Sequence, residues 1–445
     1  MENNDFDKLL ELWKKLYSTR IVENEHLMMP AFHVLTSCIV KPRLIYAGHY
    51  VPLKIHHFAI QQSGTGKSEV HKLVGKTVAF LGQEYRYNSL NTFSQAGIIG
   101  QVIEKKQGIE KRHGALYDSE FLRVDEARSL VSGNNWTDDL KVTLNGYLDD
   151  LHVAKKLGPG WLSYEGRAVI ATGTFYFQNL KPSLIEDGFM QRFNMSYKRY
   201  TTDDILRISG KFDALSSLDY LEDVKPMLEE IKTIAQGIIG MQEKYAIQVG
   251  EQKQYVIKMN EETSKYFGEK VDSFFMEHIA NLFKNSVLQN NINSFLIRGK
   301  VLGHKFMAQH AVLTGKDAVD NESADYAFPL VCDHLRSIAN FLTDAFELDE
   351  YDIISDTTKT TKLKIAERNI AQWIIKNDKH TVGDFREFIQ NNRNFLSIGE
   401  LAALKLLGKM RIDGKIIDEK GEGSTIYLSV NMERDNKNYG NNENN

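Results

Sequence analysis

The chain has 445 residues, with a hydrophobic fraction of 42%, a charged fraction of 26% and a formal net charge of −4. Such a chain is long enough for two or three globular domains, and its slightly acidic balance excludes a protein coated uniformly with positive charge for binding nucleic acid. Any contact with nucleic acid must therefore be local, on a loop or inside a pore.

Cysteine content and hydropathy indicate the cellular compartment in which the protein is expected. Cys38 and Cys332 are the only cysteines, and they lack the spacing of a zinc site or a disulfide framework. No apolar run approaches the roughly 18–20 residues that a membrane span needs, and the acidic, polar start at Met1 does not resemble a signal peptide. We expect a soluble protein of the reducing cytoplasm with no membrane partner.

The first 210 residues divide into two segments. Residues 1–45 are predicted to be helical and to pack on the second segment, because they are too few for an independent domain. Residues 46–210 alternate strand-like and helix-like stretches, which is typical of an α/β fold with a parallel sheet. Apolar strands are predicted at Lys54–Ile60, Phe121–Val124 and Arg167–Ala171. In such sheets, ligands collect at the carboxyl ends of the strands.

The stretch Gln61-Gln62-Ser63-Gly64-Thr65-Gly66-Lys67-Ser68 follows the first of these strands and precedes a helical pattern. This is the arrangement of a phosphate-binding loop, in which residues 63–68 would hold ATP. Gly64 and Gly66 let backbone N–H groups turn toward a phosphate, and the helix start adds a positive dipole end. Lys67 supplies a charge for the β- and γ-phosphates, and Ser68 supplies a hydroxyl for Mg²⁺.

Two carboxylates follow the predicted strand Phe121–Val124. Downstream of a phosphate loop, Asp125 is expected to hold Mg²⁺, directly or through water, and Glu126 to polarise the attacking water as general base. An Asp-Glu pair taken alone is more often a solvated surface feature, so the interpretation depends on the buried strand before it and the loop upstream.

A strand exit and a loop arginine are weaker candidates. Thr174, or alternatively Thr172, ends the third predicted strand, where a hydroxyl can sense the γ-phosphate; an ordinary strand exit explains the stretch equally well. Arg192 stands between aromatic residues and is a candidate to neutralise charge on the phosphate of a neighbouring subunit. Its alternative is a surface arginine paired to a carboxylate.

The turn Leu157-Gly158-Pro159-Gly160 is flanked by strand-like runs and predicts a β-hairpin between Leu151 and Arg167. Lys155 and Lys156 lie on the tip side of this hairpin. In a ring these lysines would line the central pore and meet DNA phosphates without reading bases, whereas the alternative is a solvated turn.

The remaining chain is predicted to be mostly helical. Residues 211–345 form a helical lid, residues 346–362 a linker, and residues 431–445, with seven asparagines, a disordered tail. Residues 363–430 show three helices and two short strands around a glycine-bearing turn, the pattern of a winged helix. Its third helix carries Lys405, Lys409 and Arg411, which could enter a DNA groove. Nearby carboxylates leave a protein-docking module equally open.

Taken in order, these motifs resemble the AAA+ motor of the minichromosome-maintenance (MCM) helicases over residues 50–335. The stretches that carry the resemblance are Ser94–Ile99, His113–Leu116, Asp125-Glu126, His152–Lys156, Trp161–Arg167, Gly188–Phe193, Ile297–Leu302 and Val319–Ala327. The resemblance implies that Arg192 is the arginine finger, that Arg298 is the sensor-2 arginine, with Lys305 as a possible second basic residue, and that residues 152–167 form the pre-sensor hairpin.

The chain departs from that family at three points. Gly66 stands where the family usually has alanine before the loop lysine, Thr174 stands where the family has asparagine, and no large N-terminal region with an oligonucleotide-binding fold and zinc is present in these 445 residues. Gln61, in addition, replaces the first glycine of the general phosphate-loop pattern. We therefore expect a shortened form, of the kind carried by viruses, plasmids or mobile elements.

These observations predict an ATP- and Mg²⁺-dependent DNA helicase or translocase that assembles as a homo-oligomeric ring, expected to be a hexamer. The alternatives are a loader, remodeller or DNA-bound regulator that hydrolyses ATP without unwinding, and a DNA-binding regulator with a degenerate ATPase. Replication proteins are the expected partners.

Overall fold

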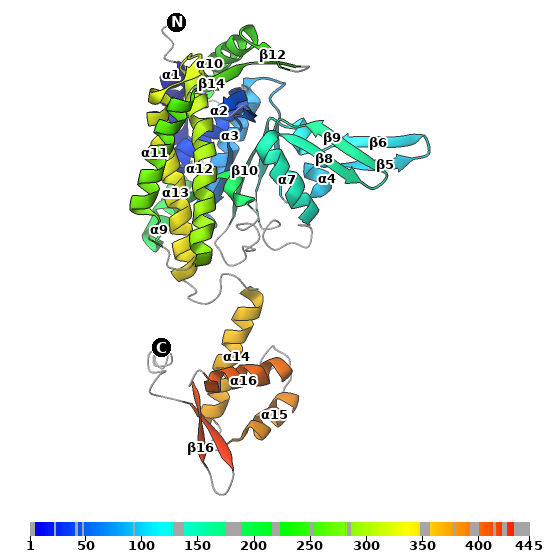
Figure 1. The fold of residues 1–445 in the computed structure, drawn as a ribbon, viewed down its shortest axis with the longest axis vertical. Coiled ribbons are helices and arrows are strands. Elements are labelled where there is room, and N and C mark those ends of the chain that lie inside the picture. The colour runs from blue at the N-terminus through cyan, green and yellow to red at the C-terminus, as the bar shows by residue number, and fades with distance from the viewer. Residues whose placement is uncertain are drawn as a thin grey trace. The chain divides into compact units, whose positions relative to one another are not determined.

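The computed structural model describes residues 5–21, 24–40, 43–46, 49–91, 94–125, 127, 138–174, 188–215, 223–249, 252–280, 282, 286–347, 357–376, 380–391, 400–412, 415–420 and 425–430. The chain divides into two compact units, Met1–Leu348 and Asp349–Asn445. Each unit is described separately (Figure 1).

A five-stranded parallel sheet forms the centre of the first unit, in the order β11-β3-β10-β7-β4. The expected α/β fold with a parallel sheet is therefore confirmed. The strands are β3 (His56–Ile60), β4 (Tyr87–Leu90), β7 (Phe121–Val124), β10 (Val169–Thr174) and β11 (Phe193–Tyr197). The prediction for residues 121–124 is confirmed residue by residue, whereas β10 begins and ends later than predicted. Every residue of β3, β7, β10 and β11 is buried, as expected for strands covered on both faces.

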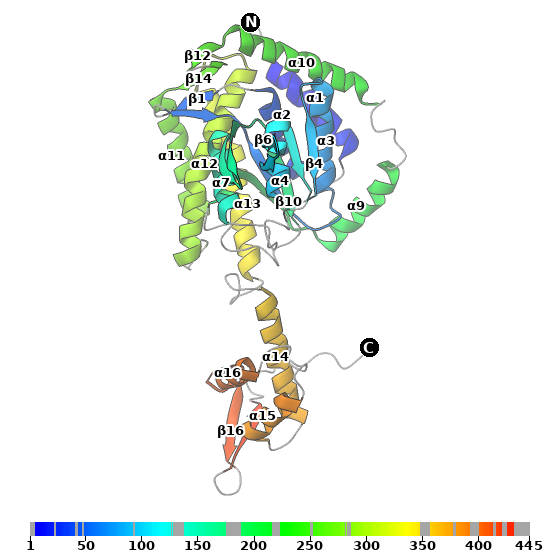
Figure 2. The ribbon, with the colours of Figure 1, turned by 90° about the vertical axis from the view of Figure 1, so that its right-hand side faces the viewer.

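Helices cover this sheet and carry the apolar stripes that the sequence predicts. The described helices of the unit are α1 (Asp5–Arg20), α2 (Met28–Ile39), α3 (Lys67–Leu81), α4 (Gln95–Ile98), α5 (Ala115–Asp118), α7 (Asp138–Asp150), α9 (Thr202–Leu215), α10 (Lys225–Lys244), α11 (Glu261–His278), α12 (Ser286–Leu313) and α13 (Asn321–Glu347), with the 3-10 helices η1 (Glu25–Leu27) and η2 (Met190–Arg192). Leu9, Trp13 and Leu16 of α1 are fully buried. Figure 2 shows α10 running beside α1 and α3. Within the described residues, no helix is both long and apolar enough to span a membrane.

A second, smaller sheet joins the N-terminal segment to the region predicted as a helical lid. Its order is β15-β14-β1-β2, with bounds β1 (Arg43–Tyr46), β2 (His49–Pro52), β14 (Val256–Met259) and β15 (Ala318–Val319). Residues 211–345 are thus less purely helical than expected, and they also contain the pair β12 (Ile247–Val249) and β13 (Gln252–Gln254). The pairing of β1 with β14, with Arg43 opposite Val256, links distant parts of the chain, which local sequence patterns do not reveal.

Two β-hairpins project from the same side of this unit (Figure 1). They are β5 (Gly100–Lys105) with β6 (Gly108–His113), and β8 (His152–Leu157) with β9 (Gly160–Glu165). The second is the hairpin predicted between Leu151 and Arg167. The two hairpins pack together at Gly160, where a β-carbon would lie 3.3 Å from Val102 and 3.7 Å from Ile109.

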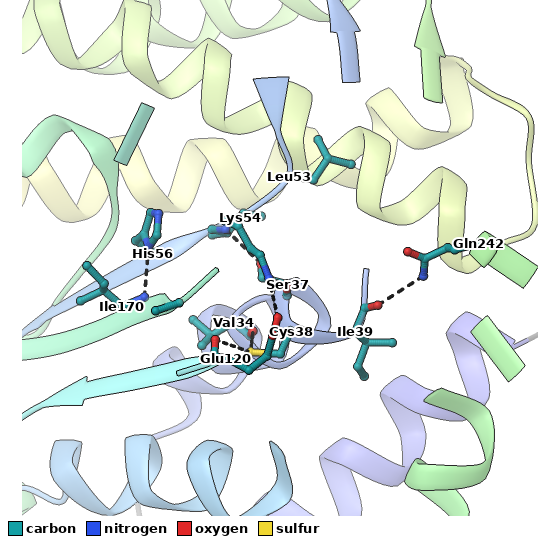
Figure 3. Close-up of polar contacts among 12 residues, drawn as sticks. Val34, Ser37, Cys38, Ile39, Leu53, Lys54, His56, Glu120, Ile170 and Gln242 are labelled. Carbon is teal, nitrogen blue, oxygen red and sulfur yellow. Dashed lines mark hydrogen bonds and ion pairs between the residues drawn. The ribbon is translucent and has the colours of Figure 1, made fainter. Parts of the chain in front are cut away.

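A buried polar network joins the helices to the amino-terminal edge of the central sheet (Figure 3). Lys54 Nζ, just before β3, donates to Glu120 Oε1 at 2.7 Å and to the carbonyl of Ser37 at 2.9 Å. From α12, Gln309 Nε2 donates to Ser37 Oγ at 2.7 Å and Lys305 Nζ donates to the Lys54 carbonyl at 3.0 Å. Because these groups are buried, α12 is held on the sheet by bonds that water cannot replace.

The second unit contains the three helices and two strands that the sequence predicts. Its elements are α14 (Thr357–Lys376), α15 (Val382–Asn391), α16 (Glu400–Ile412), β16 (Ile416–Lys420) and β17 (Ile426–Val430), and the two strands pair antiparallel. Trp373 and Phe385 are buried in a core of its own. Helix α14 begins at Thr357, inside the segment expected as a linker, and the predicted disordered tail at residues 431–445 lies outside the described residues.

Buried histidines predict loss of stability in mild acid. Burial lowers the pKa of His33 to about 4 and that of His334 to about 3. In the unfolded chain both titrate near the ordinary value of about 6.5, so the unfolded state binds more protons, and stability present above pH 6.5 is lost as the pH falls toward the folded pKa values. We expect urea denaturation to give a free energy of unfolding lower by about 2 kcal/mol per such histidine at pH 5 than at pH 7.

His334→Gln should reduce this pH dependence, and the same change at the exposed His278 is the matched control. Equal unfolding free energies at the two pH values would contradict the interpretation.

Candidate functional site

The loop Gln61–Ser68 has the geometry of an anion-binding turn. It leaves the carboxyl end of β3 and enters α3 at Lys67. Gly64 and Gly66 adopt φ angles of 76° and 85°, in the left-handed region that favours glycine. The first N–H groups of α3 have no acceptor within their own helix, so they and the helix dipole are directed at the loop, where an anion would be stabilised.

Lys67 is held across the loop. Its side chain is buried, and Nζ lies 3.4 Å from the carbonyl oxygens of both Gln61 and Gln62. Gly173 of β10 makes room for it, because a β-carbon there would lie 3.0 Å from Lys67 Cδ. Hydrogen bonds of 3.4 Å are long, and phosphate oxygens at the loop would be stronger acceptors for this ammonium group.

Gln61, at the position of the missing glycine, braces the loop. Its side chain is fully buried, and Nε2 donates to Asn24 Oδ1 at 3.0 Å and to Thr65 Oγ1 at 2.8 Å, while Oε1 lies 3.1 Å from His26 Nε2. Asn24 Nδ2 donates to the Thr65 carbonyl at 2.6 Å, and Tyr200 donates to Asn24 Oδ1 at 2.7 Å. Sequence reasoning alone missed this network. The only signal for it was an amide where glycine is usual.

Asp125 follows β7 at the same edge of the sheet as the loop. Its Oδ2 lies 2.7 Å from Arg123 Nη2, and Arg123 Nε donates to Ser89 Oγ at 3.1 Å. A Ser68 hydroxyl and an Asp125 carboxylate are suitable oxygen ligands for Mg²⁺, which commonly takes one or two protein groups together with substrate phosphates. Among the described residues, no group of three or more His, Cys, Asp or Glu side chains is placed to hold a metal ion. Glu126 lies outside them.

The two threonines of β10 differ in their surroundings. Thr172 Oγ1 donates to the Val124 carbonyl at 3.0 Å, so this hydroxyl serves the contact between β10 and β7. Thr174 lies opposite Ile60, the residue before the loop, and its carbonyl accepts from Gln61 N at 3.4 Å. Of the two, Thr174 is therefore the one that lies beside the loop Gln61–Ser68.

Arg192 lies at the opposite edge of the sheet. It immediately precedes β11, whose first residue, Phe193, pairs with His56 at the start of β3, whereas the loop follows Ile60 at the end of that strand. Four residues of extended chain separate the two levels by roughly 13 Å. The structure thus brings Asp125 and Thr174 to the edge that carries the loop and places Arg192 away from it.

Arg192 and Arg298 meet on one carboxylate. Arg192 Nη2 lies 2.8 Å from Asp149 Oδ2, and Arg298 Nη1 lies 2.8 Å from Asp149 Oδ1. Arg192 Nη1 also donates to the carbonyl of Gly188 at 2.6 Å, and the φ of 75° at Gly188 explains the glycine. All three charged groups line a concavity at this edge together with Lys305, whose pKa burial lowers to about 8.

Strand alternation separates the two hairpin lysines. Along β8 the side chains of Val153, Lys155 and Leu157 are buried, whereas Lys156 is exposed. Opposite Lys156 lies Trp161 of β9, which is 60% exposed. Only Lys156 is therefore presented to solvent, and the expectation that Lys155 also faces a DNA strand does not match its burial in this chain.

Acidic neighbours neutralise part of the basic surface of the second unit. Arg411 Nε donates to Asp418 Oδ1 at 2.9 Å, and Lys415 Nζ lies 3.2 Å from Glu367 Oε2. Lys409 is exposed, and the side chain of Lys405 lies outside the described residues.

The network around Gln61 predicts a measurable loss of stability. Gln61→Ala removes two buried hydrogen bonds, to Asn24 Oδ1 and to Thr65 Oγ1, and at about 0.5–1.5 kcal/mol each their loss costs about 1–3 kcal/mol. Urea denaturation should show this decrease in the free energy of unfolding. The matched control is Gln83→Ala at an exposed turn, expected to change it by less than about 0.5 kcal/mol. Equal values for the two variants would show that the network does not stabilise the loop.

A comparison of the sequence with protein-family models found no match, and a comparison with curated proteins likewise found none.

Proposed function

We propose that this protein is an ATP-driven, ring-forming DNA helicase or translocase of the MCM-like AAA+ type, in a shortened form that replicates a virus, plasmid or mobile element. The observation that carries the proposal is the division of one site over two edges of the sheet. The phosphate loop, Asp125 and Thr174 share the carboxyl edge, whereas Arg192 and Arg298 share the opposite edge.

The sheet order supports an AAA+ core. Strand β10 lies between β3, which leads into the phosphate loop, and β7, which leads to Asp125. Thr174 at the end of β10 therefore lies between the loop Gln61–Ser68 and Asp125. A hydroxyl at this point could position a water for attack on a terminal phosphate. The three helices and antiparallel strand pair of residues 357–430 support a winged helix as the second unit.

The separation of the two edges favours a shared site in a ring. An arginine at the amino-terminal edge cannot reach the loop of its own chain, because the sheet lies between them. In a head-to-tail ring, the loop edge of one subunit faces a different surface of its neighbour. Each interface can therefore combine the loop Gln61–Ser68 of one copy with the arginines of the next. A guanidinium delivered in this way neutralises charge that develops on the transferred phosphoryl group.

Within one interface, the residues divide the work of ATP hydrolysis. Lys67 and the N–H groups of the loop bind the β- and γ-phosphates, and Ser68 with Asp125 would hold Mg²⁺, which supplies charge neutralisation there. Glu126 is proposed as the general base, and Thr174 as the residue that positions the water.

The proposed DNA contact is the exposed face of the hairpin β8–β9. Lys156 offers a charge for a phosphate, and the neighbouring Trp161 offers an aromatic surface on which a base can stack. The second unit contributes Lys409, whereas the ion pairs of Arg411 and Lys415 leave less free charge for a groove.

Mixing two inactive variants tests the shared site. Lys67→Ala removes the cradle and Arg192→Ala removes the guanidinium, so each variant alone should lose ATP turnover, by about a thousandfold for the arginine. Mixed in equal amounts, about a quarter of the interfaces in a random ring combine an intact cradle with an intact arginine, and turnover should recover accordingly. Arg336→Ala, an exposed arginine on α13, is the control. Wild-type turnover by Arg192→Ala alone would contradict the shared site.

A forked-DNA assay separates the helicase from its alternative. The wild-type protein should displace a strand in the presence of ATP. Hydrolysis that DNA stimulates without strand displacement would instead identify a loader, remodeller or DNA-bound regulator.

Single lysine variants test which face of the hairpin meets DNA. Lys156→Ala should lower DNA-stimulated turnover and reduce the slope of log affinity against log salt by about one, because one phosphate contact is lost. Lys155→Ala should leave that slope unchanged, since its side chain is buried. Binding titrations over a range of salt concentrations measure both. The reverse result would place the DNA on the other face of the hairpin.

A further inference from the structure

We propose that Asp149 is a positioning residue that couples the arginine pair, Arg192 and Arg298, to the hairpin β8–β9. In this inference, which rests on the proposed function, the Asp149 carboxylate holds both guanidinium groups until the phosphate of a neighbouring subunit's nucleotide competes for them. Release of Asp149 then frees the base of the hairpin to move. DNA that displaces the hairpin acts in reverse and frees the arginines for the phosphate.

The concavity at this edge holds a surplus of positive charge around one carboxylate. Among the described residues that line it, four are basic and Asp149 alone is acidic; the basic residues are Lys54, Arg192, Arg298 and Lys305. Each oxygen of Asp149 accepts from a different arginine. A phosphate offers the same arginines more negative charge and more acceptor oxygens, so it competes directly with this carboxylate.

The arginines are more firmly held than the carboxylate. Arg298 belongs to α12, which the bond from Lys305 to the Lys54 carbonyl anchors on the sheet. Arg192 is tied to the carbonyl of Gly188 and leads directly into the buried strand β11. Asp149 is the second-last residue of α7, and its side chain is 39% exposed. The helix is anchored just before it, because Tyr147 and Leu148 are buried and the Tyr147 hydroxyl donates to the Ala168 carbonyl at 2.6 Å. When the ion pairs break, we infer that the part able to shift is the short segment beyond this anchor, Asp149–Leu151.

The end of α7 leads directly into the hairpin. Leu151, between α7 and β8, has a φ of 64° and is the one non-glycine residue in the left-handed region among the described residues. Such a conformation costs about 1–3 kcal/mol and marks a point that the surrounding contacts hold in place. The carbonyl of Leu151 also accepts from Gly166 N at 2.8 Å, which closes the base of the hairpin. A shift of Leu151 would therefore act on β8, which it precedes, and on the end of β9, which is bonded to it through Gly166.

The test compares Asp149→Asn with Asp150→Asn in the full-length protein. Both variants remove one negative charge at the end of α7, and the asparagine at 150 keeps an acceptor for the backbone N–H of His152, which Asp150 Oδ1 accepts at 2.9 Å in the wild type. Asp149→Asn should raise ATP turnover without DNA and lower the ratio of DNA-stimulated to basal turnover by about tenfold, because a charge-assisted hydrogen bond corresponds to about that factor. Asp150→Asn should retain the wild-type ratio.

A label on the hairpin provides a readout independent of catalysis. Cys38 and Cys332 are buried, so a cysteine introduced at the exposed Ser163 of β9 can be labelled selectively with a fluorophore. Addition of a non-hydrolysable ATP analogue without DNA should change the fluorescence anisotropy in the wild-type and Asp150→Asn backgrounds. In the Asp149→Asn background the change should be lost.

The outcomes separate this inference from the proposed function. If the wild-type protein hydrolyses ATP with DNA stimulation but Asp149→Asn behaves like Asp150→Asn in both measurements, the coupling is wrong and the proposed function stands. A basal turnover that falls to the level of Arg192→Ala would show that Asp149 only orients the arginines, which also overturns the coupling. Absence of ATP turnover in the wild-type protein would overturn the proposed function itself.

Discussion

The buried ion pair between Lys54 and Glu120 is the interaction on which the placement of both edges of the site depends. Lys54 precedes β3 and Glu120 precedes β7, so the pair joins the starts of two strands, one on each side of β10, whose far ends lead into the loop Gln61–Ser68 and into Asp125. The Lys54 carbonyl also accepts from Lys305 of α12. Loss of one partner of a buried pair costs about 3–5 kcal/mol, because the other charge is left without compensation. Lys54 thus links the starts of these two strands to the helix that carries Arg298.

This anchoring bears on the expectation that residues 211–345 form a helical lid. A lid that opens and closes needs few buried contacts with the core, whereas α12 is bonded to the sheet through Lys305 and Gln309, and β14 pairs with β1 from the N-terminal segment. Arg298, Lys305 and Gln309 are spaced so that they lie on one face of the helix. The distance between the arginine pair and the loop of the same chain is therefore set by the length of the strands. This separation is the reason why we propose a site shared between copies.

Gln61, which replaces the first glycine of the motif, has a structural role, because its side chain supports the loop through hydrogen bonds. Glycine at position 61 would leave the loop without this support, whereas Gln61 fixes it to Asn24, which comes from the segment between α1 and α2. The N-terminal residues are thus part of the site, although they carry no recognised motif. Similarly, Arg123 is a charged residue within a buried strand because Asp125 and Ser89 provide its partners.

The sequence by itself determined the local elements of the site. The glycine turn of residues 61–68, the apolar strand at residues 121–124 and the hairpin around Gly158 were predictable, because each depends on neighbouring residues and on turn chemistry. The alternation that separates Lys155 from Lys156 is also local, but which of the two faces solvent depends on what packs against the hairpin. Only the tertiary structure decided that Gln61 meets Asn24, that β1 pairs with β14 and that Arg192 and Arg298 share Asp149. These contacts join residues far apart in the chain, and their partners are selected by packing and by the need to pair buried charge, which no local pattern specifies.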